Sequence, residues 1–302
     1  MSLTLNMVGG GGGGLKATDA LLRVQAPAGS TVTVSKGTTT KTDLGHENAD
    51  DHTVYDYYFI IHASQFDSVN PWTVTATLSG DSASDTIVID TADEYDVVFY
   101  AILPSGYTSV EYIQSTGTQR ITIPLATAKN IFALKMVADI AIMGQASSDG
   151  ASIIGDVDIA PYMKFIDDRN SGIYPTCNTD GAVAGTPDPS LLNTRAELTF
   201  DGSDGTLKIY KADNLWYSGA RSTKTVNSLS LLATYRGTGY SYICMAAKLY
   251  KFKVYDTDHI TLLKDCYPCY RNSDSVVGLY DKVSETFLTN AGTGTFIVGS
   301  DL

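Results

Sequence analysis

Hydrophobic and polar residues alternate along the first third of the chain. Residues 31–36 read Thr-Val-Thr-Val-Ser-Lys and lead to a turn at Gly37. Residues 72–78 place Trp, Val, Ala and Leu on one face, and a Ser-Gly-Asp turn at 79–81 leads into a second strand. A period of two, broken by Gly, Asp and Ser, is typical of antiparallel strands packed in a sandwich. The pattern therefore predicts a small all-β domain over residues 15–101.

A longer series of strands follows residues 102–106, where Pro104 and Gly106 predict a hinge. Residues 131–143 are apolar enough for a central strand. Two Asp-Gly pairs within residues 201–205 favour a hairpin turn. We therefore expect a second all-β domain over residues 102–302.

The most regular alternation lies in the later strands of this series. Tyr250, Phe252 and Val254 are expected to face the core, and Lys251 and Lys253 to face outward. No stretch shows a sustained apolar period of 3.6 residues with capping residues, so we expect almost no helix.

The chain begins with residues 1–14, which include an unbroken glycine run from Gly9 to Gly14. Glycine loses more conformational entropy on ordering than any other residue. The run predicts either a flexible leader or a segment that is ordered only on assembly into a larger particle.

The formal net charge of the 302-residue chain is -12. Nucleic acid and anionic membranes bind basic faces, so this charge opposes both as partners, although acidity also serves solubility. No apolar run approaches the roughly 18 residues of a membrane span. The first residues lack the charged and apolar regions of a signal peptide, so we expect folding in a cytoplasm.

The cysteines are Cys177, Cys244, Cys266 and Cys269. Cys266 and Cys269 form one C-x-x-C pair, with no second pair or histidine at a zinc-ligand spacing. No βαβ unit surrounds the pair, as a redox dithiol would require. We expect ordinary thiols.

Catalytic patterns are weak. Asp156 and Asp158 share one strand face and form the best-placed carboxylate pair, but two turn or edge aspartates are commoner than a catalytic pair. No nucleophile elbow, Walker A motif or dinucleotide fingerprint occurs. We expect the protein not to be an enzyme, with a glycan hydrolase as the less favoured alternative.

Two segments resemble a known family. Residues 103–121, "LPSGYTSVEYIQSTGTQRI", resemble an opening segment of phage and prophage tail proteins of Gram-positive gut bacteria. Residues 265–299 resemble the closing stretch of that family, through Pro-Cys-Tyr-Arg, Ser-Asp, Gly-Leu-Tyr-Asp and Thr-Asn-Ala-Gly. Ser275 stands where the family often has glycine. In this family the two segments flank a concanavalin A-like, laminin-G-like jelly roll.

The resemblance implies an architecture. Residues 15–101 resemble immunoglobulin-like or carboxypeptidase-regulatory-like modules, and residues 102–302 would form the concanavalin A-like lectin/glucanase-fold domain. The closing hairpin would return beside the first strand of this jelly roll and close the sheet. Leu279, Phe287 and Phe296 would then fill the core.

The resemblance also implies two candidate sites. Sandwiches of this kind often bind Ca²⁺ at a rim, which selects Asp201 and Asp204 in one loop and Asp167 and Asp168 in another, although ordinary turn chemistry explains both loops. Tyrosine is more abundant than phenylalanine, 19 against 9, and suits wet binding surfaces. A glycan site is expected in one of two aromatic clusters, or these side chains are half-buried on a sheet face. The clusters are Trp216, Tyr217 and Arg221, and Tyr235, Arg236, Tyr240 and Tyr242.

The function implied is that of a non-enzymatic virion protein, a tail or receptor-binding component whose lectin-like domain binds a bacterial surface glycan. Other virion subunits and further copies of the chain would be its partners, and multiple copies would strengthen weak single-site binding. The alternative is a structural decoration or tail-scaffold protein that makes only protein–protein contacts.

Overall fold

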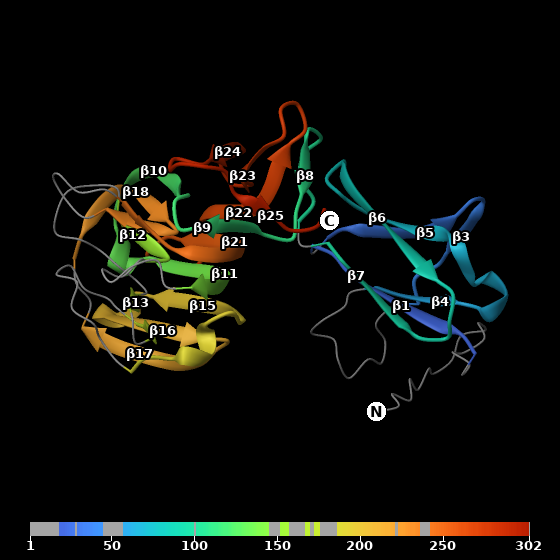
Figure 1. The fold of residues 1–302 in the computed structure, drawn as a ribbon, viewed down its shortest axis with the longest axis horizontal. Coiled ribbons are helices and arrows are strands. Elements are labelled where there is room, and N and C mark those ends of the chain that lie inside the picture. Colours follow the sequence, from blue (N-terminus) through green and yellow to red (C-terminus); the bar gives the residue numbers. More distant parts are fainter. Residues whose placement is uncertain are drawn as a thin grey trace. The chain divides into compact units, whose positions relative to one another are not determined.

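The computed structural model divides the chain into two compact units, residues 1–109 and 110–301 (Figure 1). Each unit is described by itself. The residues that the structure describes are 18–27, 29–44, 57–99, 101–144, 152–156, 167–169, 172–175, 186–220, 223–235 and 242–301. The predicted glycine-rich leader lies outside these ranges. Strands dominate both units, so the chain is all-β as predicted.

The first unit is a sandwich of two sheets. One sheet holds β4, β1 and β7 in that order, with β1 and β7 parallel, and the other holds β3, β2, β5 and β6. Trp72, Val74 and Ala76 of β5 are buried in its core, as their alternation predicts. The strand bounds are β1 (Ala20–Gln25), β2 (Thr31–Lys36), β3 (Thr39–Lys41), β4 (Tyr57–Ile61), β5 (Asp67–Leu78), β6 (Asp81–Ile89) and β7 (Glu94–Val98). The short strand β8 (Tyr107–Ser109) belongs to neither of these two sheets.

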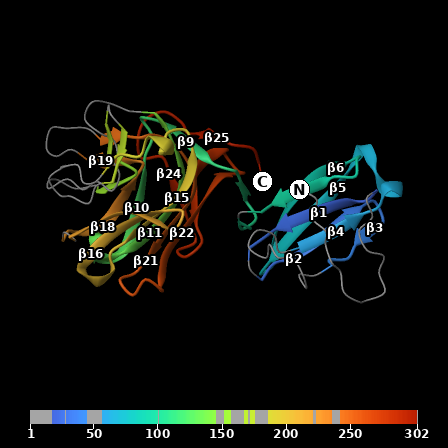
Figure 2. The ribbon, with the colours of Figure 1, turned by 90° about the horizontal axis from the view of Figure 1, so that it is seen from below.

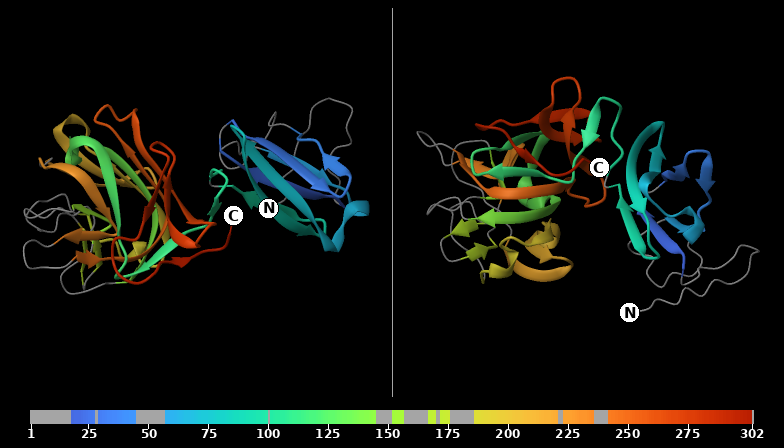
Figure 3. Two further views of the ribbon diagram at one scale, coloured as in Figure 1. Left: turned by 90° about the horizontal axis from the view of Figure 1, so that it is seen from above. Right: turned by 45° about the vertical axis from the view of Figure 1, so that its right-hand side comes forward.

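The second unit contains a large sheet in the order β17-β16-β15-β11-β21-β22-β23-β24, with β9 pairing both β21 and β25. A smaller sheet has the order β10-β18-β12. The hairpins β13–β14 and β19–β20 complete the described strands. Figures 2 and 3 show these strands in layers.

The strand bounds of the second unit are β9 (Ile113–Thr116), β10 (Ile121–Asn130), β11 (Lys135–Gly144), β12 (Ile154–Asp156), β13 (Asp167–Arg169), β14 (Gly172–Tyr174), β15 (Arg195–Asp201), β16 (Thr206–Lys211), β17 (Asn214–Ala220), β18 (Thr225–Leu231), β19 (Ala233–Tyr235), β20 (Tyr242–Cys244), β21 (Ala246–Tyr255), β22 (Leu262–Arg271), β23 (Val276–Asp281), β24 (Thr286–Thr289) and β25 (Ile297–Val298).

The core of the second unit is formed by side chains of both sheets. Met136, Phe200 and Phe252 of the large sheet belong to the same buried cluster as Ile123 and Leu229 of the smaller one. Because successive side chains of a strand point to opposite faces, the residues between these core positions lie on the other face of the large sheet. We call this the outer face.

A bulge in β21 changes which residues face the core. Asp139 of β11 pairs Lys251, but the next residue, Ile140, pairs Leu249, so Tyr250 is the extra residue. Leu249 therefore occupies the core, and Tyr250 is absent from the core cluster. Tyr250 is buried, with 8% of its surface exposed, but it lies on the face opposite to the predicted one, whereas the outward direction of Lys251 is confirmed.

The closing segment is a folding element of the sandwich. Leu279 and Phe296 are buried in the core as predicted. Phe287 is not, because it pairs Tyr280 on the outer face, and Leu288 packs against the core beside it. The hairpin β23–β24 is followed by β25, which pairs the first strand of the unit, β9. The chain thus returns to the first strand through β25, and not through the hairpin as expected, because the hairpin pairs β22.

Two details explain residues of the closing motif. A Cβ atom on Gly278 would lie 2.2 Å from the carbonyl oxygen of Leu288, so this position of the Gly-Leu-Tyr-Asp motif requires glycine. Ser275, at the β22–β23 turn, has a φ of 56°, in the left-handed region that favours glycine. A glycine at this turn would adopt that φ without the steric cost that serine bears.

Helical structure among the described residues consists of four short 3₁₀ segments, in accord with the predicted near-absence of helix. None of the helices in the described ranges is long and apolar enough to cross a membrane. The segments are η1 (Ala63–Gln65), η2 (Ile131–Ala133), η3 (Pro189–Leu191) and η4 (Ser203–Gly205).

Three cysteines are buried free thiols: Cys244, Cys266 and Cys269. Burial raises the pKa of the Cys266 thiol, and raises that of Cys269 to about 12. Thiols held in the protonated form are poor nucleophiles and metal ligands. Cys177 lies outside the described residues.

Candidate functional site

A hollow lies on the outer face of the large sheet, and strand register explains its shape. Tyr210 of β16 pairs Thr199 of β15. Thr199 pairs Val137 of β11, which in turn pairs Lys253 of β21. The two middle residues of this row are short, and the two at its ends are long. Because neighbouring strands are about 4.8 Å apart, the short residues leave a depression two strands wide.

Longer side chains border this floor on the adjacent rows. Lys135 lies between Asp201 and Tyr255 in the register on one side. The hollow has a volume of about 430 Å³, within the roughly 300–1,000 Å³ of small-molecule sites. Its lining residues are Lys135, Val137, Glu197, Thr199, Asp201, Tyr210, Asp213, Lys251, Lys253 and Tyr255.

Two of the three lysines of the hollow lie against tyrosine rings. Lys135 Nζ is 5.5 Å from the ring centroid of Tyr255, and Lys251 Nζ is 5.7 Å from that of Tyr267. Burial and the neighbouring charge of Lys253 lower the pKa of Lys251. The result is a concave surface in which aromatic rings and charged groups alternate.

The outer face also carries a pair of carboxylates. Glu197 lies directly opposite Asp139 in the register. Arg195 donates two hydrogen bonds to Asp139, with nitrogen–oxygen distances of 2.9 and 2.7 Å. The carboxylate of Asp139 is therefore engaged, and Glu197, which is exposed, is the better placed to meet a ligand.

One of the predicted calcium ligands, Asp201, already has partners within the protein. Burial opposes its ionisation, but the Ser203 N–H and the neighbouring charge of His259 contribute to holding the pKa of its carboxyl below the ordinary value. The Ser203 N–H donates to Asp201 at 2.9 Å, and His259 Nδ1 lies 3.2 Å from the same oxygen. Asp201 thus accepts a hydrogen bond from the first residue of η4 and lies at the rim of the hollow.

The side chains of the other predicted calcium ligands are not described. Asp167 and Asp168 form backbone pairs of the β13–β14 hairpin, but their side chains and that of Asp204 are outside the described set. Within the described ranges, no group of three or more His, Cys, Asp or Glu side chains is arranged to hold a metal ion. The calcium site stays a prediction.

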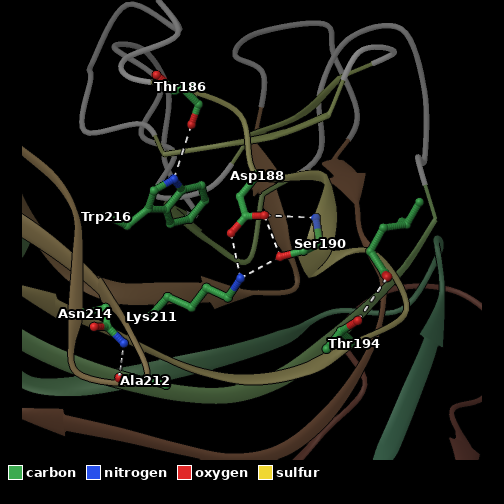
Figure 4. A network of polar contacts seen from close by, with 9 residues as sticks. Thr186, Asp188, Ser190, Thr194, Lys211, Ala212, Asn214 and Trp216 are labelled. Carbon is green, nitrogen blue, oxygen red and sulfur yellow. Dashed lines mark hydrogen bonds and ion pairs between the residues drawn. The ribbon is translucent and has the colours of Figure 1, made fainter.

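Trp216 and Tyr217 lie on β17, at the edge of the large sheet. Trp216 is the unpaired residue of a bulge opposite β16. Its Nε1–H donates to the carbonyl oxygen of Thr186 at 3.2 Å, beside the contact of Lys211 with Asp188 (Figure 4). Both aromatic side chains are half-buried and pack against the core. This arrangement matches the packing alternative rather than an exposed stacking platform.

The second predicted cluster is only partly within the described chain. Tyr235 of β19 pairs Tyr242 of β20 in the backbone register, and their side chains are not described. Arg221, Arg236 and Tyr240 lie outside the described residues, so their predicted role in glycan binding stays a prediction. The same holds for the candidate catalytic residue Asp158, whereas Asp156 ends β12 in the smaller sheet.

Sequence reasoning missed the hollow. The outward positions of Lys251 and Lys253 were readable from the alternation, and so were the short residues Val137 and Thr199 on their own strands. Only the pairing of β15 with β11 and of β11 with β21 brings those residues together. No local signal in the sequence specifies that pairing.

Fold and site together define an all-β sandwich protein with a polar, aromatic hollow on one sheet. Comparison with family models gives no match, and no curated protein matches the chain. Among solved structures, a "putative carbohydrate binding protein" from Bacteroides ovatus ATCC 8483 is similar at 11% identity, with a TM-score of 0.40 over 93% of this chain and 82% of that one. The function is therefore argued from the hollow and the sequence.

Proposed function

We propose that the second unit is a lectin-like module that binds a glycan in the hollow of the outer face. The observation that carries this proposal is the short floor of Val137 and Thr199, bordered by tyrosines and charged side chains. A sugar has apolar ring faces and polar edges. The tyrosines offer rings for its faces, and the charged groups offer hydrogen-bond partners for its hydroxyls.

The chemistry of the lining favours a hydroxyl-rich ligand over an apolar one. Most small-molecule pockets are lined chiefly by apolar side chains with a few polar groups. Here Val137 is the only aliphatic residue of the lining, and six lining residues carry charge. An apolar ligand would leave these charged groups desolvated without partners, which is costly.

We further propose that the chain is a phage or prophage virion protein, a tail or receptor-binding component that attaches to a bacterial surface glycan. The support is the resemblance of residues 103–121 and 265–299 to tail proteins. Weak binding by one hollow would be strengthened by several copies in the particle. The alternative, a decoration or scaffold protein, would bury the outer face against a neighbouring subunit.

The test is a substitution that fills the hollow with a larger side chain. The variant Val137→Phe places a large ring between Tyr210 and Lys253 while leaving the core face unchanged. Val283→Phe is the matched control, because Val283 is exposed at the β23–β24 turn. The full chain is displayed multivalently on an array of Gram-positive cell-wall and capsule polysaccharides, with and without Ca²⁺.

We expect wild type and Val283→Phe to bind the same glycans and Val137→Phe to lose them. Equal binding by both variants would remove the hollow as the site. A blank array from folded protein would favour the scaffold alternative. Release of sugar products would favour the hydrolase, and Glu197→Gln would then test whether Glu197 acts in it.

A further inference from the structure

We propose that the glycan is acidic, with carboxylate or phosphate groups that bind beside the ammonium groups of Lys135 and Lys251, at the two ends of the hollow. This inference rests on the proposed function and names the chemical class of the ligand. It follows from how the charges of the hollow are distributed and from which of them already have partners.

The three lysines of the hollow differ in their partners. Lys253 Nζ lies 3.3 Å from a carboxylate oxygen of Asp265, so its charge is balanced within the protein. Within the described part of the chain, Lys135 and Lys251 form no ion pair and contact tyrosine rings instead. A ring face attracts a cation but does not neutralise it. Two ammonium groups on adjacent strands are thus left to a ligand.

The burial of Lys251 adds to this argument. Its pKa is lowered because the side chain is partly removed from water and because Lys253 lies on the same face, two residues along β21, although the charges of Asp265, Glu197 and Asp139 partly oppose this shift. Both effects disfavour the charged form of the amine. An anion bound beside Lys251 would offset them further, which would add a gain in binding that a neutral ligand does not supply.

The carboxylates of the hollow that lack a described partner lie on other strands than Lys135 and Lys251. Glu197 is on β15 and Asp213 is in the β16–β17 turn, whereas the lysines are on β11 and β21. The remaining carboxylate, Asp201, is engaged by Ser203 and His259. Asp139 pairs Lys251 in the register, but Arg195 engages its carboxylate. A ligand would direct its anionic groups toward Lys135 and Lys251 and its hydroxyls toward Glu197.

The net charge of the whole chain makes the test more specific. At a net charge of -12, the protein offers no general attraction to an anionic polymer. Any binding of an acidic glycan must therefore come from a local group of cations. Removing these cations should abolish the preference for acidic glycans. In a basic protein the remaining positive charge would still attract such glycans.

The experiment compares matched acidic and neutral glycans on the full, multivalently displayed chain. Polygalacturonic acid is paired with its carboxyl-reduced form, and phosphomannan with dephosphorylated mannan, within the wider polysaccharide array. The variants are Lys135→Met, Lys251→Met and the double variant, in which methionine keeps the aliphatic stem over the rings. Lys282→Met, at the β23–β24 turn, makes the same change of charge outside the hollow.

We expect acidic members to be preferred by wild type and Lys282→Met. The double variant should bind them about tenfold or more weakly, as expected for loss of hydrogen bonds to a charged group, while neutral members are unaffected. The salt dependence of binding should also be weaker in the double variant. Preference for the carboxylate pair or the phosphate pair identifies the anion.

Two results overturn the proposal in distinguishable ways. Neutral members bound as tightly as acidic ones, with no effect of either lysine variant, overturn the anionic ligand and leave glycan binding standing. A blank array overturns glycan binding and this inference with it. Each variant is checked for folding by its unfolding curve, and if Lys251→Met does not fold, Lys135→Met alone decides.

Discussion

The guanidinium carbon of Arg195 lies 3.9 Å from the ring centroid of Tyr250 on the outer face of the large sheet. Tyr250 is the bulge residue of β21, and it also meets Tyr112 edge-on, with 5.5 Å between centroids. Because of the bulge, Tyr250 does not face the core. Its ring instead stacks on the outer face, next to the hollow.

We predict that this stack contributes to stability. Tyr250→Leu and Arg195→Met should each destabilise the second unit. The double variant should be less destabilised than the sum of the two, with a coupling of about 1 kcal/mol. Urea unfolding of the four proteins measures the coupling. Additive effects would mean that the ring and the guanidinium lie together without interacting.

A second prediction concerns the buried pair of Lys264 and Asp281 in the closing segment. Lys264 Nζ lies 2.7 Å from an Asp281 oxygen, and both side chains are almost fully buried. Asp281→Asn should destabilise the second unit by about 3 kcal/mol, because it leaves a buried ammonium without its counter-charge. Adding Lys264→Met to that variant should recover part of the loss. A loss below about 1 kcal/mol would contradict the assigned role.

The same pair predicts a dependence on acid pH. Burial opposes ionisation of Asp281, but the Asp265 N–H, Lys264 and Ser284 hold the pKa of its carboxyl below the ordinary value. A group with a lowered folded-state pKa contributes stability above its unfolded pKa, roughly 4, and loses it as pH falls through the folded pKa. Unfolding free energies measured from pH 6 to pH 2 should therefore fall less steeply for Asp281→Asn than for wild type.

A third prediction is a stabilising substitution. Ser275 holds a φ of 56°, which costs a residue other than glycine roughly 1–2 kcal/mol. Glycine would remove that cost but lose roughly 0.5–1 kcal/mol more backbone entropy on folding. Ser275→Gly should therefore stabilise the second unit by about 0.5 kcal/mol, seen as a higher urea midpoint with an unchanged slope. A lower midpoint would mean that the serine side chain contributes to the turn.

The fourth prediction separates the hollow from the edge of the sheet. Tyr255→Ala removes a ring from the hollow and should weaken glycan binding about tenfold with little loss of stability. Trp216→Ala should instead destabilise the second unit, because Trp216 packs against the core and donates to Thr186. Array binding and thermal unfolding of both variants check this. The reverse pattern would restore Trp216 as the binding residue.

Much of the architecture could be predicted because strand alternation is a local property. Trp72, Val74 and Ala76 reached the core of the first unit as their period of two required, and Leu279 did so in the second. Two failures share one cause. Tyr250 and Phe287 are large and apolar, and no local pattern distinguishes a ring that faces the core from one that lies on the outer face.

The sequence by itself determined the all-β class, the near-absence of helix and the outward direction of Lys251 and Lys253. Tertiary structure alone decided the site. Whether Val137 lies beside Thr199 depends on strands about sixty residues apart pairing in one register, and a shift by one residue would move each side chain to the other face. A binding hollow made from several strands is therefore specified by register, which no single segment encodes.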